Sequence, residues 1–485
     1  MKTKTLLSIT LLIGLLVSFQ IPFVAAEDVD IIPAFTPSQD LNVDPIKLPK
    51  ITEKILKNGL TVVYVPHNEL PVVEARILFV SGTLYNPLDK PGLTNFMGNM
   101  LSKGTETRNA QQLAEEIEYV GGSLESSGGN NTSYAHVSVL KKDLELGLEL
   151  LSDIIINPSF PQEEIDREKM QLMSDFMASK DNASQIASRQ WRKYVYGEHP
   201  YGAPTNGTPE SIETLERDEL VSMYNKVIVP SNAYLIITGD ITPKSAGKLV
   251  KKYFGKWSGN AKPEITVEQP VDGAGSEILI INKPDAVQTQ IRAGYLIAPY
   301  NLGDDMYAFE VMDYLFASGG FSSRLMHRCR SELGLTYGIY GGLAPRIQRG
   351  AYTVSTSTKN DRTGEMIDEI YGIMNNCIND GFTEQELLDA KAYLTGSSPM
   401  GFETPAHLLS QIQSAILFDY GDPAAFYAKY RQGIADVTLD EINAMAKKYI
   451  LPGKVRMVMV GVAEEIRPQV EKEGFTVKVI EIDEI

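Results

Sequence analysis

The chain has 485 residues, of which 43% are hydrophobic and 22% are charged. This composition is typical of a folded globular protein with room for two or three domains, and it excludes a low-complexity or disordered chain. The formal charge of −17 argues against nucleic acid and anionic lipid as partners, because an acidic surface repels both.

The first 26 residues have the pattern of a secretory signal. A basic Met-Lys-Thr-Lys start precedes a largely apolar run over residues 6–23, and the small residues Val24, Ala25 and Ala26 follow. This order predicts a signal peptide over residues 1–26, cleaved after Ala26, with an uncleaved N-terminal anchor as the alternative. We therefore expect a periplasmic or secreted protein. No later apolar stretch reaches the roughly 20 residues needed to cross a bilayer, so no stable membrane span is expected after signal cleavage.

Residues 27–50 are acidic and contain proline without clear periodicity, which predicts an extended leader before a folded region that begins near Ile51. Two halves of the folded region then repeat one pattern. Phe160 and Phe382, Pro230 and Pro452, and Gly239 and Gly461 are each 222 residues apart in matching contexts. We interpret the chain as a tandem duplication with an N-terminal domain over 51–257, a linker rich in Gly and Pro over 258–275, and a C-terminal domain over 276–485.

Strand patterns open each predicted domain, at 61–65 and 74–80 in the first and at 288–297 in the second. Amphipathic segments at 113–120, 141–156 and 163–177 predict helices. Strands that cluster with helices packed between them indicate an α+β sandwich with a mostly antiparallel sheet.

The most informative segment is Asn-Phe-Met-Gly-Asn at residues 95–99. With its flanks it resembles the His-x-x-Glu-His helix of the pitrilysin/insulinase-like zinc peptidases, in which two histidines bind zinc and the glutamate acts on the attacking water. Here Asn95 and Asn99 stand at the histidine positions and Gly98 at the glutamate position. Residues four apart share a helix face, so the spacing is kept while the chemical groups are lost.

The family's third zinc ligand is a glutamate on a later helix, seven residues after another glutamate of the pattern. This chain keeps the earlier one as Glu168 but has Asp175 at the ligand position. Two amides and a shortened carboxylate do not suit zinc, because amide oxygens are weak, hard donors. A weak calcium or magnesium site is the alternative. Gly98 has no group that accepts a proton, and it lowers helix propensity by roughly 1 kcal/mol relative to alanine.

The five histidines do not replace the missing ligands, because none lies three or four residues from another. His199 belongs to a His-Pro-Tyr-Gly segment that also resembles the family, and a structural role in holding that loop is favoured over catalysis. Cys329 and Cys377 lie in amphipathic, apparently helical stretches. An exported protein can form a disulfide, and two buried thiols are equally consistent with the sequence.

From about residue 52 to its end the chain is similar to bacterial two-domain members of this family, whose fold is also that of the mitochondrial processing peptidase. The resemblance extends to an arginine and a tyrosine seven residues apart in the second unit, here Arg330 and Tyr337. In the family these residues reach the zinc site and contact substrate or support the oxyanion. Arg324 and Arg328 are the other candidates. The alternative is that Arg330 pairs with a surface acid while Tyr337 packs in the core.

The glycine-rich residues 121–131 align with the edge strand on which active members hold an extended peptide, although a plain loop also fits the sequence. Some family members divide their work between two polypeptides, one with His-x-x-Glu-His and one without it.

The resemblance therefore implies a non-catalytic, substrate-binding subunit of an exported heteromeric zinc endopeptidase. Such a subunit binds no cofactor itself, and zinc belongs to a homologous partner. The alternatives are a scaffold protein of the same fold without proteolytic role and an autonomous peptidase with an unrecognised site.

Overall fold

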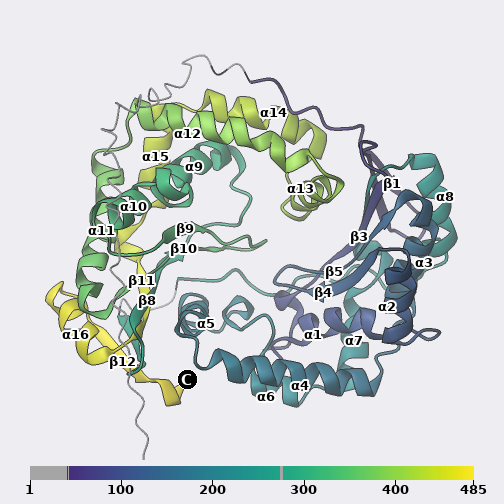
Figure 1. Ribbon diagram of the computed structural model, residues 1–485, viewed down its shortest axis with the longest axis horizontal. Helices are drawn as coiled ribbons and strands as arrows, with labels where there is room; N and C mark the ends of the chain where they lie inside the picture. The colour runs from purple at the N-terminus through teal and green to yellow at the C-terminus, as the bar shows by residue number, and fades with distance from the viewer. Residues whose placement is uncertain (1–40, 42, 273–276) are drawn as a thin grey trace, which may run out of the picture. The chain divides into compact units, whose positions relative to one another are not determined.

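The computed structural model describes residues 41, 43–272 and 277–485 (Figure 1). The predicted signal peptide, residues 27–40 and 42 of the predicted leader, and residues 273–276 lie outside the described residues. Among the residues that are described, no helix combines the length and the apolar character needed to cross a bilayer.

The first half of the chain forms a mixed sheet in the order β1-β2-β6-β3-β5-β4. Its strands are β1 (Thr52–Ile55), β2 (Thr61–Pro66), β3 (Val72–Val80), β4 (Ser123–Gly128), β5 (Thr132–Leu140) and β6 (Ala233–Gly239). Only the β2–β6 pair is parallel; the other neighbours are antiparallel. Within the glycine-rich segment 121–131, for which the sequence left two interpretations, residues 123–128 thus form strand β4, which lies at the edge of the sheet.

The second half repeats this arrangement in the order β12-β7-β11-β8-β10-β9. Its strands are β7 (Ile278–Asn282), β8 (Gln288–Leu296), β9 (Ile339–Leu343), β10 (Ala351–Lys359), β11 (Arg456–Gly461) and β12 (Val477–Glu481). Strand β7 pairs in parallel with β11 and with β12. The two sheets differ at one edge. The edge strand β1 precedes all other strands of the first sheet in sequence, whereas the edge strand β12 follows all other strands of the second sheet. The predicted α+β class is confirmed.

The first half contains a series of helices. They are α1 (Leu93–Met100), α2 (Ala110–Tyr119), α3 (Leu144–Ile156), α4 (Gln162–Ser179), α5 (Ala183–Tyr196), α6 (Pro209–Glu213), α7 (Arg217–Val227) and α8 (Pro243–Phe254). Of these, α1, α2 and α3 contact the sheet of their own half. Capping boxes begin several of them; at α2 the Asn109 side chain accepts from Gln112 N, and the Gln112 side chain accepts from Asn109 N. These bonds satisfy main-chain N–H groups that have no partner inside the helix.

The second half has a matching series of helices. They are α9 (Met306–Asp313), α10 (Arg324–Met326), α11 (Thr363–Asn379), α12 (Glu384–Ser397), α13 (Pro405–Leu417), α14 (Pro423–Asp436), α15 (Leu439–Tyr449) and α16 (Ala463–Lys472). Two π-helical segments interrupt this series, η7 (Tyr314–Ser318) and η9 (His327–Glu332). The wider π turn shifts the direction of the side chains that follow it and is frequent at functional sites.

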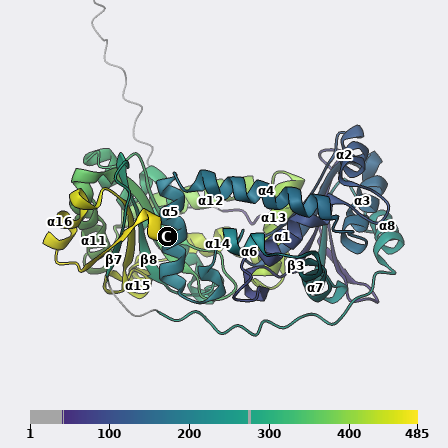
Figure 2. The same cartoon turned by 90° about the horizontal axis from the view of Figure 1, so that it is seen from below.

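One helix of each half packs against the sheet of the other half. Helix α5 packs against β8 and β11, and α13 packs against β3 and β6 (Figures 1 and 2). The Trp191 indole on α5 donates to Thr353 Oγ1 on β10 at 3.0 Å. On the other side, Leu408 and Ile412 of α13 join a buried cluster with Val63 and Ile236. The two halves therefore share core residues.

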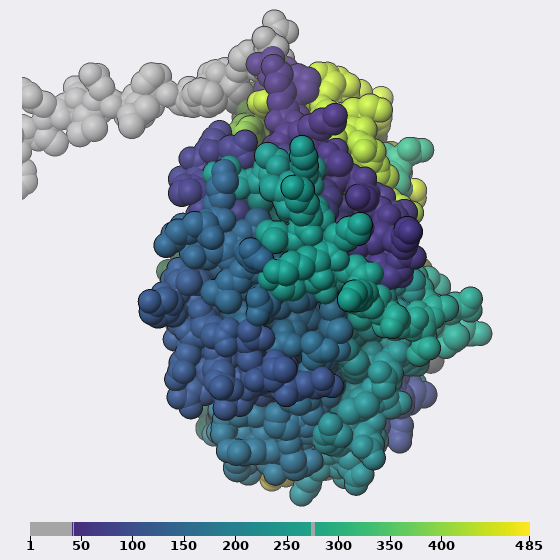
Figure 3. Space-filling view, turned by 90° about the vertical axis from the view of Figure 1, so that its right-hand side faces the viewer, coloured from purple at the N-terminus to yellow at the C-terminus, as the bar shows by residue number. Residues whose placement is uncertain are grey.

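The described part of the predicted leader, residues 41 and 43–50, contains no helix or strand. It is linked to the second half where Arg431 Nη1 of α14 donates to the Asp44 carbonyl oxygen at 2.7 Å. On the face seen in Figure 3, purple N-terminal residues lie beside yellow-green residues of the second half. The chain thus enters its first sheet along a surface to which both halves contribute.

Candidate functional site

Helix α1 places the first predicted site residues. The Asn86 side chain accepts from Thr94 N at 2.9 Å and from Thr94 Oγ1 at 2.8 Å, which satisfies one main-chain N–H group in the first turn of the helix. Phe96, Met97 and Met100 are fully buried and fix the helix against the core. Asn95 and Asn99 lie on its half-buried face, as their spacing of four predicts.

Both asparagine side chains are engaged by neighbouring protein groups. The Asn95 amide donates to the Gly128 carbonyl oxygen on β4. The Asn99 amide donates to Glu168 Oε1 on α4 at 3.1 Å, and Asn99 Oδ1 accepts from Ser127 Oγ at 3.2 Å. These bonds tie α1 to β4 and α4, so the two amides act as structural cross-links.

Gly98 lies where α1 meets the main chain of β4. A Cβ atom on Gly98 would lie 2.6 Å from Gly128 N and 2.7 Å from Ser127 C. Those atoms belong to the backbone and cannot rotate away. The position at which the family carries a glutamate therefore has no room even for a methyl group.

Asp175 does not join this cluster. It is exposed on α4, and its Oδ1 accepts from Gln171 Nε2 at 3.0 Å. Glu168, seven residues or about two turns earlier, reaches Asn99 instead. In the part of the chain that the structure describes, no three His, Cys, Asp or Glu side chains converge as metal ligands. The residues at positions 95, 98, 99 and 175 do not fit zinc, because the two amides are committed to protein partners, Asp175 points elsewhere and Gly98 has no side chain.

His199 is held as part of a loop. Its Nδ1 accepts from Tyr201 N at 3.1 Å, so its Nε2 carries the proton and faces Gln348 Oε1 at 2.9 Å and the Glu268 carbonyl oxygen at 3.1 Å. Burial lowers the pKa of His199, although these two bonds raise it in part. A neutral, fully hydrogen-bonded imidazole of this kind fixes the loop.

Arg330 and Tyr337 lie together in the second half. The Arg330 guanidinium stacks on the Tyr337 ring at 4.3 Å from its centroid and on the Phe321 ring at 4.6 Å. Tyr337 is 83% exposed and Phe321 is 62% exposed. The Arg330 side chain forms no hydrogen bond or ion pair with any residue that the structure describes. The alternative in which Arg330 pairs with an acid and Tyr337 packs in the core is thus wrong for this structure.

The other two candidate arginines are already paired. Arg324 forms a two-bond fork with Glu386 at 2.7 and 2.8 Å. Arg328 forms a fork with Glu369 at 2.8 and 3.0 Å and also donates to Glu332 at 2.7 Å. Arg324 also stacks on the Phe382 ring, at 4.5 Å from its centroid. Among the described residues, Arg330 is the one of these three arginines without a carboxylate partner, which leaves its N–H groups available to a ligand.

Sequence reasoning missed Phe321 as a member of this cluster. Nothing in the spacing of the sequence showed that its ring would cover Arg330. The reason is the π-helical segment η9, which carries Arg330 and departs from the regular 3.6-residue period. A helix phase inferred from sequence cannot anticipate that shift.

The sequence left open whether the two cysteines form a disulfide. In the structure both are buried and free. Arg324 Nη1 donates to Cys377 Sγ at 3.7 Å. Burial raises the pKa of the Cys329 thiol to about 12 and that of Cys377 to about 11. Both are packing residues rather than reactive thiols.

Comparison with known proteins agrees with the fold. The family model described as insulinase (peptidase family M16) matches residues 61–209, and that described as the peptidase M16 inactive domain matches residues 214–394. The chain belongs to the M16 family.

M16 relatives include proteins named as peptidases and as non-peptidases. A Rickettsia felis protein named as an uncharacterized zinc protease is 26% identical over 81% of this chain and 93% of its own length. A Helicobacter pylori protein named as a non-peptidase homolog, YmxG, is 23% identical over 82% of this chain and 90% of its own.

Among solved structures, a peptidase M16 inactive domain from Pseudomonas fluorescens superposes with a TM-score of 0.79 at 23% identity, covering 85% of this chain and 98% of that one. This likeness shows a shared fold. One family model and this solved structure carry the description of an inactive domain, and one relative is named a non-peptidase homolog.

Proposed function

We propose that this chain is the non-catalytic, substrate-binding subunit of an exported heteromeric zinc endopeptidase that degrades or processes peptides. In this proposal zinc is held by a homologous partner with an intact His-x-x-Glu-His helix, and this chain binds no cofactor. The predicted signal peptide supports a periplasmic or secreted complex.

The observation that carries the proposal is the state of Arg330. A guanidinium that pairs with no carboxylate among the described residues and is oriented by two exposed rings is suited to donate to a peptide carbonyl oxygen or its tetrahedral adduct. Stacking costs Arg330 none of its donors, because the rings contact its faces and the N–H groups lie in its plane.

The state of α1 explains why a partner is needed. Gly98 lies against Gly128 and both asparagines are hydrogen-bonded, so the first half cannot supply a metal-activated nucleophile. In the proposed complex, this chain supplies the substrate-contacting pair Arg330 and Tyr337, and the partner supplies the metal ligands that this chain lacks.

Reconstitution tests this proposal. The purified chain alone should show no stoichiometric zinc and no peptide cleavage. Addition of the partner identified by copurification from the native source should produce chelator-sensitive cleavage. In that complex Arg330→Ala should reduce turnover by about 10²-fold, the scale of losing one oxyanion donor.

Arg467→Ala is the matched control, because Arg467 on α16 is an exposed arginine whose ion pair is with its own helix neighbour Glu471. It should leave turnover unchanged. Unaltered turnover by the Arg330→Ala complex would remove Arg330 from the mechanism. Native complexes without any chelator-sensitive peptidase activity would instead favour a scaffold role.

A further inference from the structure

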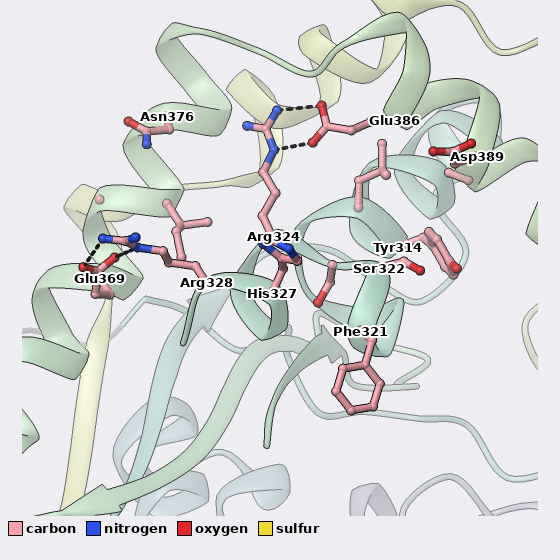
Figure 4. A pocket seen from close by; sticks show the side chains of 15 residues that line it. Tyr314, Phe321, Ser322, Arg324, His327, Arg328, Glu369, Asn376, Glu386 and Asp389 are labelled. Carbon is pink, nitrogen blue, oxygen red and sulfur yellow. Dashed lines mark hydrogen bonds and ion pairs between the residues drawn. The ribbon is translucent and has the colours of Figure 1, made fainter. Parts of the chain in front are cut away.

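A cavity of about 610 Å³ lies in the second half (Figure 4). It adjoins the Arg330 cluster, which consists of Arg330 and the Phe321 and Tyr337 rings that stack on it. Segments η7 and η9 and helices α10, α11 and α12 surround the cavity. Its wall includes the apolar Leu315, Ile373 and Ala390 and the aromatic Tyr314 and Phe321. This volume is in the range of small-ligand sites, so the cavity can receive one or two amino-acid side chains.

The two arginines in the wall are already neutralised. The Arg324–Glu386 and Arg328–Glu369 forks are visible as dashed lines in Figure 4, and Arg328 also contacts Glu332. An anionic ligand would have to break one of these forks to gain a partner. The cavity therefore disfavours anions even though arginines line it.

Asp389 is the uncommitted charge in the wall. It is exposed on α12, its Oδ1 accepts only from the Gln385 amide at 2.9 Å, and it pairs with no cation among the described residues. Tyr314 lies close to it (Figure 4). Burial raises the pKa of Tyr314, and the charge of Asp389 raises it further. The Tyr314 ring also stacks on Tyr393 at 5.0 Å between centroids.

We propose that this cavity binds the cationic side chain of a lysine or arginine in an extended peptide. The ligand's methylene groups would lie along Leu315 and Ile373, and its charged end would meet the Asp389 carboxylate beside the Tyr314 ring. The choice of a peptide as ligand rests on the proposed function; the choice of a cation rests on the charges of the wall.

Phe321 connects the cavity to the Arg330 cluster. Its ring lines the cavity and also stacks on Arg330. A peptide whose carbonyl oxygen meets Arg330 would therefore have a nearby side chain within reach of the cavity. The acidic character of the whole chain, −17, adds long-range attraction for basic peptides.

The first test uses the chain alone and fluorescence anisotropy. A labelled peptide with one internal arginine and the same peptide with norleucine at that place are titrated with the native chain, Asp389→Asn and Glu384→Gln. Glu384→Gln removes the same charge from the same helix but does not line the cavity. We expect the arginine peptide to bind about 3- to 10-fold more weakly to Asp389→Asn, with the norleucine peptide and Glu384→Gln unaffected.

The second test fills the cavity without touching a charge. Gly372 of α11 lines it, and a Cβ there would meet no atom within 4 Å. Gly372→Leu should therefore fold normally, because leucine favours helix over glycine, and should abolish the preference for arginine. Gly396→Leu is the control, since Gly396 is also helical and open but lies outside the cavity.

Equal binding of the arginine and norleucine peptides to the native chain would overturn the proposal, as would tighter binding of a glutamate peptide. Tight binding of free agmatine that matches the arginine peptide would overturn the choice of a peptide. All these titrations use the chain without its partner. If the chain prefers the arginine peptide but reconstitution with the partner gives no cleavage, the proposed function is wrong and the cavity proposal stands.

Discussion

Gly98 and Gly128 meet backbone to backbone where helix α1 crosses strand β4. A Cβ on Gly98 would lie 2.6 Å from Gly128 N, and a Cβ on Gly128 would lie 2.5 Å from Asn95 Cα. Each glycine thus makes room for the other's segment. The main chain of β4 occupies the space that a glutamate side chain would need, and the Asn95 amide fixes this arrangement by donating to Gly128.

Gly98→Ala should destabilise the protein even though alanine is the better helix former. The added methyl group gains about 1 kcal/mol of helix propensity, but its clash with backbone atoms has the larger cost of overpacking. We expect a net loss of at least about 1 kcal/mol in the free energy of unfolding, measured by urea denaturation.

Gly372→Ala is the control for this change, because Gly372 is also helical and has open space around its Cβ position. It should raise stability by up to about 1 kcal/mol. If Gly98→Ala also raised stability, the close packing of α1 on β4 would not constrain position 98.

The packing of Gly98 on Gly128 could not be predicted from the sequence, although other features of α1 could. The spacing of Asn95 and Asn99 placed both on one face correctly, and the loss of zinc ligands followed from residue types alone. From sequence, Gly98 was only a weak point in a helix. Its burial against Gly128 depends on a strand 30 residues later in the chain, which no local pattern reveals.

Tyr337 offers a way to separate its hydroxyl from its ring. Tyr337→Phe keeps the face on which Arg330 stacks and removes only the hydroxyl, which makes no hydrogen bond in the described structure. If that hydroxyl contacts substrate in the proposed complex, turnover should fall by roughly 10-fold while the free energy of unfolding stays unchanged.

Tyr337→Ala provides the comparison, because it removes the ring as well and should reduce turnover further by releasing Arg330. The same loss from both variants would assign the effect to the hydroxyl. A normal rate for Tyr337→Phe would limit Tyr337 to orienting Arg330.

The duplication could be predicted because its marks are local. Phe160 and Phe382 both precede long helices and both are buried, and Gly239 and Gly461 end the equivalent strands β6 and β11. The exchange of α5 and α13 could not be predicted in this way. Each is an ordinary amphipathic helix in sequence, and only the complete fold shows which sheet it covers.

The helix exchange predicts that the two halves unfold together. Ile412→Ala on α13 removes fully buried atoms from a cluster built with strands of the first half, at a cost of about 2–5 kcal/mol. In a Trp191→Phe background the remaining tryptophan, Trp257, reports on the first half, where it packs on Phe79. Its fluorescence transition should shift with Ile412→Ala and coincide with the transition seen by circular dichroism.

Ser410→Ala serves as the control on α13, because the Ser410 hydroxyl is exposed and bonds only within its own helix. It should leave the Trp257 transition in place. Two separate transitions, with only the later one sensitive to Ile412→Ala, would show that the halves are independent.

Asp313 predicts a pH dependence of stability. Burial raises the pKa of Asp313 to about 6, although the Tyr352 hydroxyl that donates to it acts in the opposite direction. The ordinary aspartate value is about 3.9, so between about pH 4 and 6 the folded state binds more protons than the unfolded state. The free energy of unfolding therefore falls as pH rises through this range.

Asp313→Asn keeps an acceptor for Tyr352 and removes the charge. It should be more stable than the native chain by on the order of 1–3 kcal/mol at pH 7.5, and this gain should shrink towards pH 4. Urea unfolding at several pH values measures the difference, with Asp166→Asn as the control because Asp166 is exposed on α4. A gain that stayed constant with pH would mean that Asp313 is charged in the folded protein throughout, and that Tyr352 and its surroundings stabilise the carboxylate.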